Sequence, residues 1–166
     1  QASLMLMVSI CIIFAINMKD MKDEELFKEK AASGYTVCCV DTCPLREECL
    51  RWLVWQQMPA TKATFSCVNP KYEGVGTEHC AYHRNARKVL MARGMTQIFT
   101  DDMSKKVEQG VRNTLIERYN RAYYFEYRNG KRIIPPSMQE EIRQVFRDYG
   151  WNEEVEFDGY IEAYDW

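Results

Sequence analysis

Cys39-Val-Asp-Thr-Cys43-Pro-Leu-Arg-Glu-Glu-Cys49-Leu-Arg-Trp52 is a cysteine-rich segment of the chain, with three thiols within eleven residues. Pro44 has a preset φ and lacks an N–H that the first residue of a helix does not need, so it can begin a helix directly after Cys43. Cys49 follows less than two turns later. Sulfurs presented by such a corner can converge on a metal ion or cluster if a fourth ligand arrives from elsewhere.

The sequence therefore predicts a metal site in the first half of the chain. The expected ligands are Cys39, Cys43, Cys49 and Cys80, with Cys38, Cys67, His79 and His83 as substitutes. Zinc would take four cysteines, or three cysteines and one histidine. A [4Fe-4S] cluster would use the same four thiols. The spacing leaves the choice of metal open.

The composition is that of a globular protein rather than a disordered chain. The 166 residues are 46% hydrophobic and 28% charged, which suits one ordinary domain or two small ones. Seven cysteines are an odd count, and this argues against a fully paired extracellular disulfide framework. We expect a reducing, cytoplasmic location.

Four regions are expected along the chain. Residues 1–17 contain an apolar run that is too short to span a bilayer comfortably, and they read as a leader or upstream read-through. The competing interpretation is the remnant of a membrane anchor, the one case in which the protein would meet a membrane. Residues 18–95 form the cysteine-rich region, residues 96–150 a basic helical module and residues 151–166 an acidic tail.

The predicted fold class is mainly α, a small multi-helix protein with a metal-binding corner and a helix-turn-helix-like C-terminal half. Apolar periodicity and capping residues predict helices over 21–32, 44–57, 78–92, 101–119 and 136–149. Residues 58–78 are predicted to be a loop. Residues 121–134 stay ambiguous, because Asn129-Gly130 is a strong hairpin signal and Gly130 can equally end a helix.

Charge is unevenly distributed along the chain. Residues 84–132 hold twelve Lys or Arg against five Asp or Glu, whereas residues 133–166 hold two against nine. A basic segment next to an acidic one is a pattern of nucleic-acid binders with a self-shielding tail. Solvated helix faces that attract each other within the fold would give the same distribution.

The basic residues interleave with tyrosines between positions 118 and 132. This arrangement is similar to the helix-turn-helix region of phage-repressor-like regulators, in which a second helix enters the major groove and basic residues after it hold phosphates. Tyrosines at helical spacing are also common at the boundary of a core. The candidate DNA contacts are Arg118, Arg121, Arg128, Lys131 and Arg132.

Two further resemblances concern the cysteines. Residues 43–52 resemble the Cys-Pro-Val-Arg-x-x-Cys-Leu segment of the WhiB-type iron-sulfur regulators of transcription, in which both cysteines ligate a [4Fe-4S] cluster. From Met18 onward, the chain resembles an uncharacterised bacterial family with a Cys-x3-Cys-Pro-x4-Cys-Leu-Arg motif, followed by Val68-Asn69-Pro70 and a Tyr-Asp-Trp ending. The second resemblance implies no activity, but it supports one ligand set of Cys39, Cys43, Cys49 and Cys80, with Cys38 and Cys67 as spares.

The sequence contains no convincing catalytic constellation and no Gly-rich phosphate loop, so a non-enzymatic role is favoured. We expect a metal-binding regulatory or DNA-binding protein. One alternative is a structural metal-binding module that binds another protein and no DNA. Another is an iron-sulfur redox sensor. No small-molecule substrate is evident.

Overall fold

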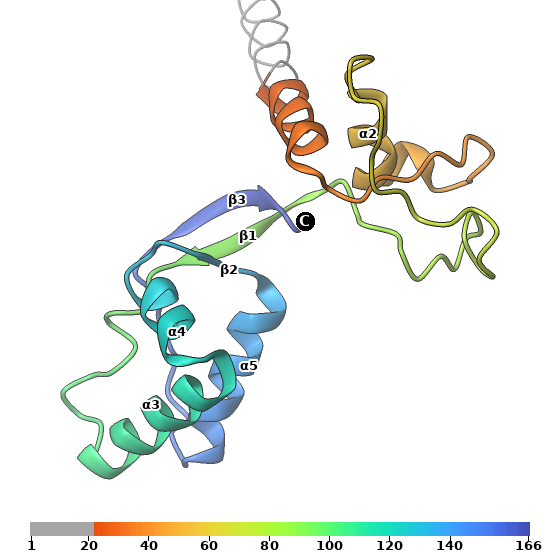
Figure 1. The fold of residues 1–166 in the computed structure, drawn as a ribbon. Helices are drawn as coiled ribbons and strands as arrows, with labels where there is room; N and C mark the ends of the chain where they lie inside the picture. Colours follow the sequence, from red (N-terminus) through yellow and green to blue (C-terminus); the bar gives the residue numbers. More distant parts are fainter. Residues whose placement is uncertain (1–21) are drawn as a thin grey trace, which may run out of the picture. The chain divides into compact units, whose positions relative to one another are not determined.

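The computed structural model describes residues 22–166, which form two compact units (Figure 1). Unit 1 contains the described residues up to Ala86 together with Trp166, and unit 2 contains residues 87–165. The units divide earlier in the chain than the predicted boundary at residues 95 and 96. The expectation for residues 1–17 lies outside the described part. Within that part, no helix is long and apolar enough to cross a membrane.

Unit 1 has short helices and long connecting segments. Residues 22–33 are helical, and the chain turns away at Gly34, whose φ of 91° suits a glycine, so the first predicted helix is confirmed. The hydrophobic cluster of unit 1 is small. The buried members are Ala31, Val37 and Val54, against which the side chains of Phe27, Tyr35, Cys39, Trp55, Met58 and Trp166 pack.

The single helix predicted over 44–57 is wrong, because it is divided at Cys49. A 3-10 turn, η1, covers Arg46–Glu48, and α2 covers Leu50–Gln56. Cys49 itself is extended, with φ −113° and ψ 116°, and its backbone pairs with Asn85. This pairing competes with continuation of the helix, and periodicity within the segment could not reveal it.

The helix predicted over 78–92 is also wrong. Residues 78–86 form turns and short extended pieces, and β1 spans Lys88–Arg93. Antiparallel pairing with β3, Tyr160–Tyr164, places Met91 opposite Ile161 and Ala92 opposite Tyr160. The apolar residues of β1 therefore belong to a sheet, and the strand that pairs with them comes much later in the sequence.

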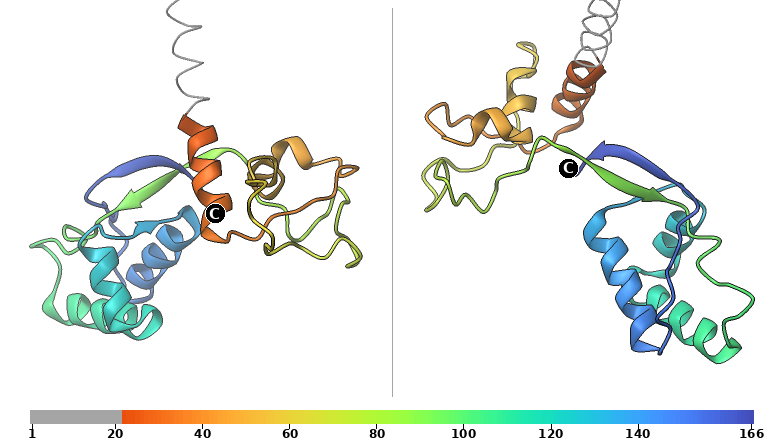
Figure 2. Two further views of the ribbon diagram at one scale, coloured as in Figure 1. Left: turned by 45° about the horizontal axis from the view of Figure 1, so that its top comes forward. Right: turned by 180° about the vertical axis from the view of Figure 1, so that it is seen from behind.

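Unit 2 packs helices against a three-stranded antiparallel sheet of order β2-β1-β3, in which β2 spans Ile133–Ile134. Helices α3 (Lys105–Tyr119), α4 (Arg121–Arg128) and α5 (Pro136–Asp148) lie to one side of it (Figures 1 and 2). Their core is more extensive than that of unit 1. Its largest fully buried side chains include Tyr124, Phe146, Met95, Ile98 and Leu115.

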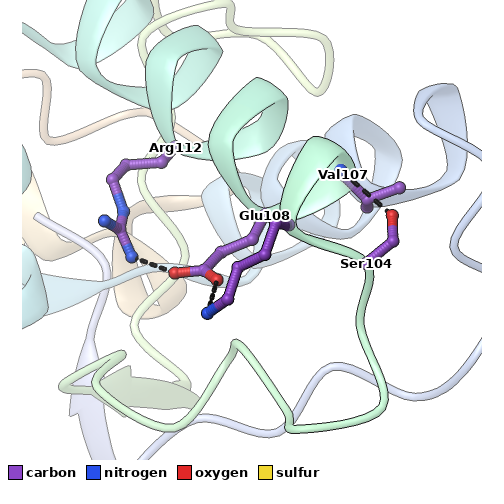
Figure 3. Close-up of polar contacts among 5 residues, drawn as sticks. Ser104, Val107, Glu108 and Arg112 are labelled. Atoms are coloured by element: carbon purple, nitrogen blue, oxygen red, sulfur yellow. Dashed lines mark hydrogen bonds and ion pairs between the residues drawn. The ribbon is translucent and has the colours of Figure 1, made fainter.

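Helix α3 begins later than the sequence indicates. Its N-cap is Ser104, whose hydroxyl accepts a hydrogen bond from the Val107 N–H at 3.4 Å, rather than Asp101 or Asp102 (Figure 3). Glu108 in the first turn receives the Arg112 guanidinium at 2.5 Å. An acidic side chain near the positive end of the helix is favourable.

The ambiguity at residues 121–134 resolves as a helix followed by a short strand. Helix α4 ends at Arg128, and Gly130 adopts a φ of 68° shortly after it. One residue, Asn120, separates α3 from α4, and its side chain accepts a hydrogen bond from the Ala122 N–H at 3.0 Å. The helix-turn-helix resemblance is not confirmed by this connection, which is shorter than the three to four residues typical of the motif.

The acidic region at residues 151–166 is part of the fold rather than a free tail. Val155 and Phe157 are buried in the core of unit 2, and β3 is paired with β1. The Asp158 carboxylate accepts hydrogen bonds from the Thr96 and Gln97 N–H groups at 2.8 and 3.0 Å. The protein is thus small and rich in helix, with a sheet that the sequence analysis did not foresee.

Candidate metal centre

Four thiols and one imidazole line a small cavity in unit 1. The cavity has a volume of about 20 Å³. Its wall is formed by Cys38, Cys43, Cys49, Cys80, His83, Leu45, Arg51, Val68, Gly76 and Tyr82. The sulfurs come from the segment before η1, from the junction of η1 and α2 and from the loop before β1. Segments far apart in sequence therefore bring soft donor atoms to one place.

The corner that carries Cys43 and Cys49 is held by its own backbone. The Cys43 carbonyl accepts from the Arg46 N–H at 3.3 Å, and the Arg46 carbonyl accepts from the Cys49 N–H at 3.1 Å. The extended conformation of Cys49 then starts a new direction for α2. Pro44 fits the start of this turn because it has no N–H to satisfy.

A second set of backbone bonds pins the loop that carries Cys80 and His83. The Leu50 N–H donates to the Arg84 carbonyl at 2.7 Å, and the Ala86 N–H donates to the Glu48 carbonyl at 2.9 Å. These bonds flank the pairing of Cys49 with Asn85. The loop is thereby fixed against the residues on both sides of Cys49.

The side chain of His83 is also engaged at this corner. Its Nε2 atom lies 3.1 Å from the Glu48 carbonyl oxygen. A neutral imidazole that donates from Nε2 keeps a lone pair on Nδ1, the arrangement in which histidines support or join metal sites.

Arg51 links the segment of Cys38 to the segment of Cys80. Its Nη1 atom donates to the Thr36 carbonyl, and its Nε atom donates to the Tyr82 carbonyl at 2.9 Å. Its own carbonyl accepts from the Cys38 N–H at 3.2 Å. One residue of α2 therefore fixes both neighbouring segments.

The structure brings three of the four predicted ligands to one cavity. These three are Cys43, Cys49 and Cys80. The fourth thiol in the cavity wall is Cys38, and Cys39 does not line the cavity. Val37 and Cys39 both pack into the hydrophobic cluster of unit 1. Side chains alternate in an extended segment, so the residue between them faces the other way. This alternation separates Cys38, which lines the cavity, from Cys39, which packs on the cluster.

The thiols influence one another. Burial raises the pKa of Cys38, and the neighbouring Cys49, Cys67 and Cys43 raise it further, against a backbone hydrogen bond at Val40 that lowers it. A cation among the thiols would oppose these effects, because it favours the thiolate.

The predicted ligand Cys39 and the substitutes Cys67 and His79 lie outside this cavity. The Cys39 Sγ atom is 3.3 Å from the Cys67 Sγ atom, and burial followed by the Cys67 hydrogen bond raises the pKa of Cys39 to about 12. His79 is exposed, and its N–H donates to the Thr77 hydroxyl at 3.3 Å. Neither Cys39, Cys67 nor His79 lines the small cavity.

The side chains that line the cavity do not converge on one point. Within residues 22–166, no three His, Cys, Asp or Glu side chains are placed so that they could hold a metal ion. Coordination would thus require the cavity thiols to rotate inward. The donor set itself, thiolates with an adjacent imidazole, is the kind that zinc prefers.

The basic candidates for DNA contact lie in unit 2, and two of them already have partners. Arg132 forms an ion pair with Glu126 and lies over the Tyr123 ring at 4.4 Å. Arg121 lies over the Phe125 ring at 5.3 Å. DNA binding through these two residues together with Arg118, Arg128 and Lys131 stays a prediction.

The tyrosines among them contribute mostly to packing. Tyr124 is 1% exposed, and Tyr119 packs edge-on against Tyr127 with ring centroids 6.0 Å apart. The Tyr119 hydroxyl donates to the Glu141 carboxylate at 3.1 Å. Tyr123 is the exposed one, and Arg132 covers it.

Comparison with known proteins places the chain in a family without assigning an activity. A family model described as "Family of unknown function (DUF6078)" matches residues 21–166, so the chain belongs to this family. No curated protein and no solved structure gives a match. The expected membership of an uncharacterised family is confirmed, whereas the likeness to WhiB-type regulators stays a prediction.

Proposed function

We propose that this member of the DUF6078 family is a zinc-binding protein in which Cys38, Cys43, Cys49 and Cys80 hold one ion inside unit 1. The observation that supports the proposal is the presence of these four thiols in the wall of a single cavity. Four cysteines are a complete structural zinc site, since zinc in such sites is tetrahedral. Tetrahedral coordination requires the four thiols to rotate toward one point.

The size of the cavity favours one ion over a cluster. Its volume of about 20 Å³ is close to the space that one water molecule requires. An ion with Zn–S distances of about 2.3 Å fits such a space. A [4Fe-4S] cube contains eight heavy atoms and would need the wall to open.

The small core of unit 1 supports a structural role for the ion. Three fully buried side chains, Ala31, Val37 and Val54, form the centre of its main hydrophobic cluster. Domains with little apolar core commonly depend on a metal or on disulfides. Binding of zinc would then contribute directly to the folding free energy, because the unfolded chain has no preformed site.

The residues around the thiols support the same role. Arg51 fixes the segments of Cys38 and Cys80, and His83 fixes the loop of Cys80 to the carbonyl that precedes Cys49. We assign both residues a positioning role. Orientation of ligands by neighbouring hydrogen bonds typically changes metal affinity by about 10- to 100-fold.

The test is metal analysis combined with an absorption spectrum on protein purified without oxygen. We expect one zinc per chain and no visible band in the wild type. Cys43→Ser should lose the zinc, whereas Cys67→Ser, a matched change at a thiol outside the cavity, should keep it. A chain that binds no metal would overturn the proposal.

Iron together with a broad visible band would instead support the competing function, an iron-sulfur redox sensor. The same thiols would then bind the cluster, so the effects of Cys43→Ser and Cys67→Ser would be unchanged. The spectrum therefore separates the two functions, and the variants test the ligand set independently of the metal.

A further inference from the structure

Cys39 and Cys67 form a pair of thiols outside the small cavity. Their sulfurs lie 3.3 Å apart, and neither takes part in a disulfide. Cys67 is exposed and Cys39 is half-buried. The two residues are 28 positions apart in the sequence, so the fold, and not the local chain, brings them together.

The backbone around the pair keeps the two segments in register. Val37 and Cys67 form a parallel bridge, in which the Val37 N–H donates to the Ser66 carbonyl at 3.0 Å and the Val68 N–H donates to the Val37 carbonyl at 2.9 Å. The hydroxyls of Thr36 and Ser66 lie 3.0 Å apart. Contacts on both sides of the thiols thus hold them as neighbours.

A second cavity gives a small molecule access to the exposed thiol. It has a volume of about 360 Å³, and Cys67 lies in its wall beside Asn69, Tyr72 and Tyr82. Cavities of about 300–1,000 Å³ accommodate typical small ligands. The Cys67 thiol, which donates to the Val68 carbonyl at 3.3 Å, is thereby within reach of a reagent of the size of a short peptide.

We propose that Cys39 and Cys67 are a redox modification site, at which a low-molecular-weight disulfide of the glutathione type converts the two thiols into a reversible intrachain disulfide. The sulfurs must approach by about 1.2 Å to reach the S–S bond length of about 2.05 Å. Side-chain rotation at two neighbouring residues can supply this movement. Neither thiol of the pair belongs to the proposed zinc ligands.

The reaction proceeds through thiol–disulfide exchange. The Cys67 thiolate attacks one sulfur of glutathione disulfide, its proton goes to solvent, and the first glutathione leaves as a thiolate. The Cys39 thiolate then attacks the Cys67 sulfur of the mixed disulfide, and the second glutathione leaves. The two protein thiols lose two electrons and two protons in all, and one glutathione disulfide becomes two glutathione thiols.

Exposure sets this order and makes the two cysteines unequal. Cys67 meets the reagent first, because it is exposed and lies in the wall of the larger cavity. Cys39 acts second and resolves the mixed disulfide. The four other cysteines of the described residues, Cys38, Cys43, Cys49 and Cys80, need not react for the site to work. Cys49 among them is buried at 8% exposure.

The experiment equilibrates the full chain in buffers of graded glutathione and glutathione disulfide, with peptide mapping by mass spectrometry after blocking of free thiols. We expect a Cys39–Cys67 disulfide in the wild type that dithiothreitol reverses. Cys39→Ser should instead accumulate glutathione on Cys67. Cys67→Ser should leave Cys39 largely unmodified.

Ser66→Ala provides a control beside the pair, since it removes the hydroxyl contact with Thr36 and leaves both thiols. It should still form the disulfide. Free thiols at both positions throughout the redox series, or a disulfide that joins either residue to a different cysteine, would overturn the proposal. Because mapping of the wild type identifies the bond directly, the result does not depend on the folding of any variant or on the presence of zinc.

Discussion

The His83 Nε2 atom lies 3.1 Å from the carbonyl oxygen of Glu48, the residue that directly precedes Cys49. This contact joins the loop of Cys80 to the corner that carries Cys43 and Cys49. His83→Ala should therefore weaken zinc binding by about 10- to 100-fold without abolishing it. Competition with a chromophoric chelator measures the change.

His79→Ala is the matched control, because His79 is exposed and lies outside the small cavity. Its zinc affinity should equal that of the wild type. An equal loss in both variants would remove the positioning role of His83.

Arg51→Lys should destabilise unit 1. The guanidinium donates to the carbonyls of Thr36 and Tyr82 at once, and an ammonium at the end of a flexible chain cannot reproduce both bonds. Hydrogen bonds from a charged donor are worth about 1.5–3 kcal/mol each, and we expect a loss of about 2 kcal/mol in the free energy of unfolding. Urea unfolding of the full chain measures it.

Lys28→Ala is the comparison within the same unit. Lys28 forms an exposed ion pair with Glu24 at 2.7 Å, and such pairs contribute about 0.3–0.5 kcal/mol. If this variant lost as much stability as Arg51→Lys, the bridging role of Arg51 would be wrong.

Gly94→Ala should destabilise unit 2 by about 2 kcal/mol. Gly94 has a φ of 79°, and a Cβ at this position would lie 2.5 Å from the Asp158 Oδ2 atom. An L side chain is strained in this conformation by about 1–2 kcal/mol before the contact is counted. The Asp158 bonds to Thr96 and Gln97 would be disturbed as well.

Gly159→Ala tests whether the effect is specific. A Cβ there meets nothing within 4 Å, and the φ of this residue is not in the left-handed range. Thermal or urea unfolding should show a much smaller change than for Gly94→Ala, and the reverse order would contradict the geometry.

Stability should decrease at alkaline pH in part through Tyr119. Burial, followed by the hydrogen bond to Glu141, raises the pKa of Tyr119 from 10.0 to about 12 in the folded protein. Between these values, the unfolded chain releases the proton while the folded chain keeps it, so the contribution present below pH 10 is lost as the pH rises to about 12. Urea unfolding as a function of pH measures the decline.

Tyr119→Phe should remove this part of the pH dependence, which appears as a shallower decline than in the wild type over the same range. Tyr72→Phe, at an exposed tyrosine of unit 1, should leave the slope unchanged. Parallel curves for wild type and Tyr119→Phe would show that the tyrosine does not couple to folding.

DNA binding through unit 2 can be tested by the salt dependence of its affinity. If the residues Arg118, Arg121, Arg128, Lys131 and Arg132 hold phosphates, affinity for duplex DNA should fall steeply with salt. Lys131→Gln should reduce the magnitude of the slope of log affinity against log salt by about 1. Lys71→Gln in unit 1 should leave it unchanged, and affinity that does not depend on salt would exclude phosphate contacts.

Local patterns predicted the helices whose signals lie within the helix itself. The helix that ends near Gly34 and the helix α5, which begins at Pro136, follow the expected caps and periodicity. The interruption at Cys49 was missed because its cause, the pairing with Asn85, lies 36 residues away. The strand β1 was missed for the same reason, because its partner β3 lies far from it in the sequence.

The cavity brings together part of the ligand set that the sequence predicts. Three of the four expected thiols line the cavity, and the choice between the adjacent Cys38 and Cys39 depended on which face of an extended segment meets the core. The contact of Cys39 with Cys67 depends on the parallel bridge at Val37, and parallel pairing between distant segments has no local signature.

Trp166 belongs to unit 1, although the strand that precedes it belongs to unit 2. Its ring packs edge-on against Phe27 and Tyr35, with centroids 6.1 and 5.4 Å away, and Lys30 lies over it at 4.6 Å. During synthesis, the other residues of unit 1 leave the ribosome before those of unit 2, yet their core lacks this indole until residue 166 has been added. The core of the unit that emerges first is therefore completed only after all of unit 2 has been synthesised.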